Sequence, residues 1–226
     1  MQIFDILGPV MIGPSSSHTA GVVRIGNVAR GILGNTPSHA DISFHGSLAK
    51  THKGHGSDKA IVAGLLGFTP EDTRIRDSLG LASEFGMSYK FEMIDLGNEA
   101  HPNTVILNLR YTDDTNESES VTIQAASVGG GSILVQKIND IDVLFKGHSD
   151  TLIIIHQDMP GAISLVTNVL AVEKINIAEM KVYRSKKGGR AIMILEVDAQ
   201  LNKDLADLIS KLPLIEQVTL LAGISS

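Results

Sequence analysis

The regular alternation of strand-like and helix-like segments from Thr151 onward restricts the fold of this chain more than any other sequence feature. Apolar and β-branched runs are typical of strands, and apolar residues spaced three and four apart are typical of helices. Six segments follow in the order strand, helix, strand, strand, helix, strand: residues 151–156, 161–173, 177–184, 190–197, 203–211 and 217–221. With Lys187, Gly188 and Gly189 at the central hairpin turn, this order forms a four-stranded sheet with both helices on one face.

Residues 1–148 follow a different pattern, in which short strands and short helices alternate with glycine-rich turns. Apolar spacing predicts a half-buried helix over residues 19–33 and a second helix, capped by Ser57 or Asp58, that runs from Ala60 to Leu66. The strands expected in this part are residues 40–44, 89–94, 104–111, 120–126 and 133–138. The chain is therefore predicted to be α+β, with a mixed N-terminal domain and a second domain over residues 151–226.

Charge and composition exclude several classes of function. The chain has 25 acidic and 19 basic residues and no basic block, so nucleic acid is not an expected partner. No apolar stretch has the length of a membrane helix and the N-terminus has no cationic start, so we expect a cytoplasmic protein without a membrane partner. The lack of cysteine excludes disulfides, thiol nucleophiles and cysteine ligation of a cluster by this chain. No histidine pair has zinc spacing, so no metal ligands are expected here.

The first chemical motif lies between Gly13 and Gly21, just ahead of a predicted helix. It combines hydroxyl groups with an imidazole: Ser15, Ser16, Ser17, His18 and Thr19. Free N–H groups and the positive end of the helix dipole at such a position suit a carboxylate or a phosphate. The alternative interpretation is an ordinary serine-rich helix cap.

The second motif, residues 46–58, places His55 between glycines immediately before a predicted helix. Glycines allow the backbone to approach a ligand closely. His55 is suited to be a general base, because imidazole titrates near neutrality and its uncharged form has a free lone pair. The alternative is a solvent-exposed histidine in a loop.

Two weaker motifs accompany these. Asn103 lies where a strand opens, and Gly129, Gly130 and Gly131 follow another strand, where their amides are suited to form an anion nest. A glycine run is otherwise a simple bulge or turn. The residues alone indicate an anion-binding pocket with histidines.

In their order along the chain, the motifs PSSSHTAG, GSLAKTHKGHGSD, HPNT and SVGGGS resemble the β subunit of iron–sulfur-dependent bacterial L-serine dehydratase, over essentially the whole length. Residues 1–148 are also similar to the allosteric substrate-binding domain of some phosphoglycerate dehydrogenases. Residues 151–226 resemble a ferredoxin-like ACT domain, a module that usually binds amino acids. The resemblance places effector contacts at Asp158, Pro160, Gly161, Asn176 and Ile177.

The resemblance implies that L-serine loses water and then ammonia to give pyruvate, in a heterodimer with an α subunit whose cysteines hold a [4Fe-4S] cluster. One iron would act as a Lewis acid on the substrate hydroxyl, and His18 and His55 would be the candidate bases. The hydroxyls from Ser15 to Thr19 would orient the substrate carboxylate or the cluster edge, and Asn103 with Gly129 to Gly131 would line the same cleft. Copies of the chain are expected to pair through the ACT or the N-terminal domain.

One residue departs from the family pattern. His52 stands where that pattern has glycine, and it could displace the loop or add a rival base.

Two other functions stay open at this point. One is a regulatory module that only binds effectors, and the other is a structural or pairing subunit that leaves the histidine motifs without a role.

Overall fold

The structure is a computed structural model that describes residues 15–113, 115 and 117–223. It contains two sheets, with strand orders β2-β1-β3-β4-β5-β6 and β10-β7-β9-β8. The chain separates into two compact units, divided between Asn139 and Asp140. A mixed α+β part is followed by a βαββαβ part, so the predicted fold class is confirmed.

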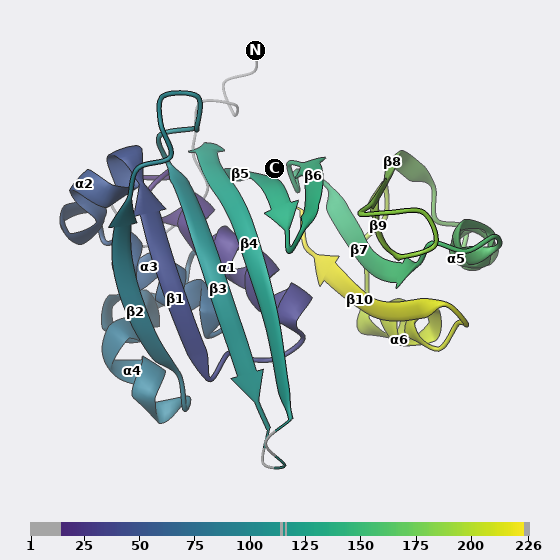
Figure 1. Ribbon diagram of the computed structural model, residues 1–226, viewed down its shortest axis with the longest axis horizontal. Coiled ribbons are helices and arrows are strands. Elements are labelled where there is room, and N and C mark those ends of the chain that lie inside the picture. Colours follow the sequence, from purple (N-terminus) through teal and green to yellow (C-terminus); the bar gives the residue numbers. More distant parts are fainter. Residues whose placement is uncertain (1–14, 114, 116, 224–226) are drawn as a thin grey trace. The chain divides into compact units, whose positions relative to one another are not determined.

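The first unit begins with helices that alternate with a strand and continues with a run of strands (Figure 1). The elements are α1 (Ala20–Leu33), β1 (His39–His45), α2 (Gly46–His55), α3 (Ser57–Leu65), a 3-10 helix (Thr73–Asp77), α4 (Ser78–Glu84), β2 (Ser88–Ile94), β3 (Thr104–Thr112), β4 (Ser118–Gly129) and β5 (Ser132–Ile138).

The sheet of this unit is mixed. Strand β1 pairs in parallel with β2 and antiparallel with β3, and β3, β4 and β5 continue antiparallel. Helix α1 packs on β3, β4 and β5, and Figure 1 shows α1 and α3 behind the sheet. Every second residue of β4 faces this helix layer, so Val121, Ile123 and Ala125 are buried.

Helices α1 and α3 lie side by side at a distance that only glycine allows. A Cβ atom on Gly64 would lie 2.1 Å from the Val23 carbonyl oxygen, and one on Gly26 would lie 2.7 Å from the Ile61 carbonyl oxygen. Later residues of α1 meet the segment just after α3: Asn27 donates to the Phe68 carbonyl at 3.0 Å, and Arg30 lies beside Gly67. Because Gly26 lies against Gly64 within α3 while Asn27 and Arg30 reach past its C-terminal end, α1 and α3 run parallel.

Residues 46–55 form helix α2, whereas the sequence predicts a loop around His52. Gly46 and Gly56 have φ values of +60° and +71°, so the two glycines bend the chain at either end of the helix. Helix α3 then begins at Ser57 itself, with Gly56 as its N-cap and no side chain capping it, so the prediction that Ser57 or Asp58 caps this helix is wrong. A further strand, β6 (Ile141–Phe145), was not predicted.

After β6, the second unit contains β7 (Asp150–Gln157), α5 (Ala162–Val172), β8 (Ile177–Arg184), β9 (Arg190–Val197), α6 (Lys203–Ser210) and β10 (Ile215–Leu221). Apolar side chains from the central strands and both helices form its core: Leu152, Ile154, Val166, Leu170, Met193, Leu195, Leu205 and Ile209. Burying each such side chain contributes about 1.5–3 kcal/mol. The Asp150 carboxylate accepts backbone N–H groups from Leu201 and Gly223, both at 2.8 Å.

Candidate functional site

The parallel course of α1 and α3 brings the two sequence-predicted histidines together. His18 lies two residues before the start of α1, and His55 lies two residues before the start of α3. Because the helices run in the same direction, both starts lie at the same end of the pair. The two imidazole rings are 4.8 Å apart between centroids and tilted by 35°.

Hydroxyl groups hold His18 through both ring nitrogens. Its Nδ1 lies 3.1 Å from Ser15 Oγ and 3.0 Å from Ser17 Oγ, and these two hydroxyls are 3.2 Å apart. Its Nε2 lies 3.2 Å from the hydroxyl of Ser47, near the start of α2. A hydroxyl can donate or accept, so this arrangement holds the neutral imidazole in either tautomer.

The environment of His18 favours its neutral form. Burial lowers the pKa of His18 below its usual value of 6.5, and the nearby charge of His55 lowers it further. His55 has a different surrounding, because its Nδ1 is buried without a hydrogen-bond partner among the described residues. The two rings therefore differ in which nitrogens already have a hydrogen-bond partner among the described residues.

The other two motifs join the same end of the helix pair. The Ser47 amide donates to the Pro102 carbonyl at 2.6 Å, and Gly46 permits this approach because a Cβ there would lie 2.5 Å from that oxygen. Asn103 is bonded to Ser127, whose amide donates to the Asn103 carbonyl at 3.1 Å. Ser127 in turn lies against Gly21, in the first turn of α1.

Buried polar atoms without a partner are concentrated in these motifs. Within the described part of the chain they include Thr19 Oγ1, His55 Nδ1, Ser57 Oγ, Asn103 Oδ1 and Ser127 Oγ. A buried polar atom without a partner costs about 1–3 kcal/mol. Such a group of atoms is typical of a site that a ligand or ordered water completes.

The start of α1 differs from the expected anion site. The amides of Thr19 and Gly21 already donate to the carbonyls of Ser15 and Ser16, at 2.8 and 3.0 Å. Thr19 is the N-cap, but its side chain makes no capping hydrogen bond. The expectation that these N–H groups are free is wrong for these two amides, and the free polar groups here are on side chains.

The remaining residues of these motifs are placed as follows. Gly129, Gly130 and Gly131 all have positive φ values, between +59° and +99°, and form the turn between β4 and β5. Ser16 is half-buried in the turn before α1. His52 packs against Phe44, with ring centroids 5.7 Å apart, and its Nδ1 lies 3.1 Å from the Ala49 carbonyl oxygen.

The predicted effector residues form two groups in the second unit. Asp158, Pro160 and Gly161 follow β7, whereas Asn176 and Ile177 lie at the start of β8. On β9, Gln157 is paired with Arg190 and Ile177 with Val197, so the two groups lie at opposite ends of the sheet. Seven residues of strand separate these ends, about 23 Å.

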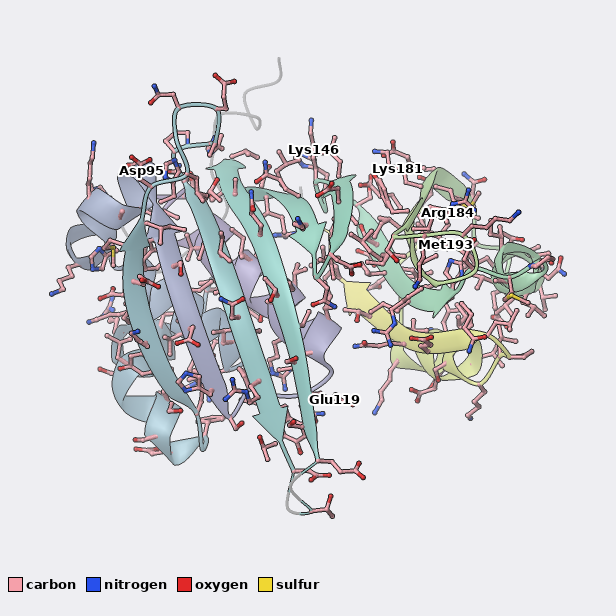
Figure 2. The ribbon with its side chains drawn as sticks, viewed as in Figure 1. Asp95, Glu119, Lys146, Lys181, Arg184 and Met193 are labelled. Atoms are coloured by element: carbon pink, nitrogen blue, oxygen red, sulfur yellow. The ribbon has the colours of Figure 1, made fainter. Side chains whose placement is uncertain are left out.

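Asp158 is engaged with the β8–β9 hairpin. Its carboxylate accepts the Gly188 amide at 2.9 Å and the guanidinium of Arg184, labelled in Figure 2, at 3.0 Å. These bonds, first from Gly188 and then from Arg184, hold the pKa of Asp158 below its usual value. Asn176 likewise donates to Asp198, at 2.6 Å. In the loop that follows, the Gly161 carbonyl accepts from the Leu165 amide at 3.0 Å and from the Ser164 hydroxyl at 2.9 Å.

His156, at the end of β7, was missed by the sequence analysis. It is 2% exposed, its Nδ1 lies 2.8 Å from the Gln157 carbonyl oxygen, and its Nε2 is buried without a partner in the described chain. Ser47, Ser57 and Ser127 were also missed as site residues, although all three lie inside or beside the motifs. A lone serine carries no sequence signal that separates a site from a surface.

Metal-ligating side chains are scattered in the part of the chain that the structure describes. Within the described residues, no group of three or more His, Cys, Asp or Glu side chains is placed to hold a metal ion. The sequence has no cysteine to supply thiolates.

No helix in the described ranges is long and apolar enough to cross a membrane.

The fold and the site define a two-part α+β chain with a histidine and hydroxyl site in its first part and an ACT domain in its second. Residues 2–96 match the family described as "Serine dehydratase beta chain", and residues 151–214 match the ACT domain family. The chain is 43% identical over 221 residues to the "Probable L-serine dehydratase, beta chain" of Bacillus subtilis (strain 168), covering 98% of each. The chain belongs to the family of L-serine dehydratase beta chains.

Two further relatives bear on function. The "L-serine dehydratase, beta chain" of Peptoniphilus asaccharolyticus is 37% identical over 202 residues, covering 89% of each chain. The "D-3-phosphoglycerate dehydrogenase" of Bacillus subtilis (strain 168) is 27% identical over 199 residues, which cover 88% of this chain and 37% of that protein.

Proposed function

We propose that this chain is the β subunit of a two-chain, iron–sulfur-dependent L-serine ammonia-lyase and supplies catalytic side chains to its active site. L-Serine loses its α-proton and its β-hydroxyl as water, and the resulting enamine tautomerises and is hydrolysed to pyruvate and ammonia. The observation that carries the proposal is the pair of imidazoles at the starts of α1 and α3, surrounded by buried polar atoms without partners.

A [4Fe-4S] cluster does not fit this chain alone, because the chain contains no cysteine thiolate to ligate it. The proposal therefore assigns the cluster to the cysteines of the α subunit.

His55 is proposed as the general base. Its buried Nδ1 has no partner among the described residues, whereas both nitrogens of His18 are held by hydroxyls. His55 Nδ1 would take the α-proton, and neutral His18 would stack beside the ring that becomes charged. Ser15, Ser16, Ser17 and Thr19 would orient the substrate carboxylate, and Asn103 with Gly129 to Gly131 would line the same cleft.

The ACT domain is proposed to sense an amino acid. Pro160 and Gly161 would contact the effector through the loop backbone, and buried His156 Nε2 would accept from its amino group. Because Asp158 and Asn176 lie at opposite ends of one sheet, a site that uses both needs two copies of the chain.

The proposed location of the enzyme is the cytoplasm.

Co-expression with the α subunit under anaerobic conditions tests the proposal. We expect pyruvate formation from L-serine that requires both chains, together with the absorbance of a loaded cluster. His55→Ala and His18→Ala should each lower turnover by about 10²–10⁴-fold with the cluster still loaded. Normal turnover in both variants would overturn the catalytic role. A loaded complex that makes no pyruvate would favour an effector-binding module, which the similarity to a phosphoglycerate dehydrogenase suggests.

A further inference from the structure

Ser127 is a buried serine whose hydroxyl has no partner. The residue is 0% exposed, and its Oγ makes no hydrogen bond within the described chain. Ile123 and Ala125 precede it on the same face of β4 and are apolar core residues. Alanine would fill this position without leaving a buried hydroxyl unpaired, so the serine is unfavourable for stability alone.

The backbone directs this hydroxyl at the start of α1. The register between β4 and β5 shifts between Ser127 and Gly129, which is a β-bulge, and bulges re-aim the neighbouring side chains. A Cβ on Gly21 would lie only 2.1 Å from Ser127 Oγ. Glycine at position 21 therefore provides the space that the hydroxyl occupies in the first turn of the helix.

Two other unpaired atoms complement Ser127. Thr19, two residues before Gly21, is 2% exposed with its Oγ1 buried and unpaired in the described part of the chain. Asn103 donates through Nδ2 to the Ser127 carbonyl at 3.4 Å, which leaves its unpaired Oδ1 as an acceptor. Two hydroxyl donors and one amide acceptor match the carboxylate and the ammonium group of a free amino acid.

We infer that Ser127 is a substrate-binding residue whose hydroxyl, together with that of Thr19, donates to the carboxylate of the amino-acid substrate. Asn103 Oδ1 accepts from the substrate ammonium group. This inference rests on the proposed function and deepens it, because it names the groups that select a free α-amino acid. Gly21 has a positioning role, since it keeps the Ser127 hydroxyl in place.

Ser127→Ala in the assembled two-chain complex tests the inference. We expect the KM for L-serine to rise about 10- to 100-fold, as for a lost hydrogen bond to a charged group, with a smaller change in kcat. The melting temperature of the isolated chain should stay the same or rise, because an unpaired hydroxyl is removed. Gly21→Ala, whose methyl group displaces the same hydroxyl, should also raise KM.

Ser78→Ala is the matched control. Ser78 is equally buried, but its hydroxyl donates to the Lys59 carbonyl at 2.7 Å, so its loss should lower the melting temperature and leave KM unchanged. An unchanged KM in Ser127→Ala, with an active wild-type complex, would overturn the inference and leave the proposed function standing. A wild-type complex that forms no pyruvate would overturn both.

Discussion

At the scale of single residues, the structure gives two histidines of similar sequence context different surroundings. The nitrogens of His18 lie within 3.2 Å of three serine hydroxyls, whereas His55 Nδ1 is buried and has no partner among the described residues. The sequence indicated that these histidines belong to a site, because each lies next to glycine or serine residues. Which ring nitrogens have a partner depends on contacts between distant residues. One example is the contact of His18 Nε2 with the hydroxyl of Ser47, which lies 29 residues further along the chain.

We expect the titration of His18 to depend on burial and on His55. Burial and the charge of His55 lower the pKa of His18 below 6.5, so the unfolded chain binds this proton more readily than the folded one. The free energy of unfolding should therefore fall as the pH drops below about 6.5 and should level off below the folded pKa. NMR titration of the His18 ring and chemical denaturation across this range measure both effects.

His55→Gln should raise the midpoint of His18 but keep it below 6.5, because burial is the larger cause. His52→Gln is the control, since His52 lies against Phe44, and it should leave the midpoint of His18 unchanged. A His18 midpoint at or above 6.5 in the wild-type chain would contradict the prediction.

At the scale of elements, the close contact between α1 and α3 determines the geometry of the site. Each histidine precedes its helix by the same two residues, and the helices meet at Gly26 and Gly64 further along. The two helices were predicted from apolar spacing, but their parallel contact was not. Which glycines in a helix serve close packing becomes clear only when the partner helix is known.

Gly64→Ala should destabilise the chain and separate the two histidines. Its Cβ would lie 2.1 Å from the Val23 carbonyl oxygen, a backbone atom that moves only with the whole helix. We expect a loss of about 1–3 kcal/mol or more in the free energy of unfolding, measured by denaturant titration. The pKa of His18 should rise toward 6.5 as the His55 charge moves away.

Gly80→Ala is the matched control for this change. Gly80 lies in α4, and a Cβ there would meet no atom within 4 Å, so this change should stabilise the chain by about 0.4–1 kcal/mol. If the two substitutions changed the free energy of unfolding equally, the close contact between α1 and α3 would not be the cause of the loss expected for Gly64→Ala.

Helix α2 shows where element prediction failed. Its sequence contains Lys50, His52 and Lys53 next to glycines and has only Leu48 buried, so it shows no apolar face. Such a segment is typical of a loop when it is judged by periodicity. Tertiary contacts stabilise it instead, among them the Ser47 amide with the Pro102 carbonyl.

At the scale of the whole molecule, each part of the chain is described by its own sheet and core. The βαββαβ order of the second part was predicted almost to the residue, because each strand and helix has a strong apolar pattern and polar turns bound it. Its predicted effector residues, however, lie at two ends of the sheet, about 23 Å apart. One amino acid extends about 3.6 Å along a chain, so one copy cannot bring both groups to the same effector.

Effector binding should therefore depend on pairing between copies. We expect L-serine, or a related amino acid, to bind the full chain more weakly on dilution and to shift it toward a dimer, because the site is completed by mass action. Calorimetry and analytical ultracentrifugation at several protein concentrations measure the two effects. A chain cut after His148 should lose both, and concentration-independent binding to a monomer would refute the prediction.

The sequence by itself determined the fold class, the order of the elements in the βαββαβ part and the motifs that belong to the site, because these depend on local apolar spacing, turn residues and recognisable side chains. The tertiary structure decided how the site is assembled. Contacts between residues distant in sequence place His18 beside His55, direct Ser127 at Gly21 and leave particular buried atoms without partners. Burial and hydrogen bonding depend on the packed chain, because the residues that contact one another are distant in sequence. The local sequence therefore does not indicate which residue will bury or hydrogen-bond a given side chain.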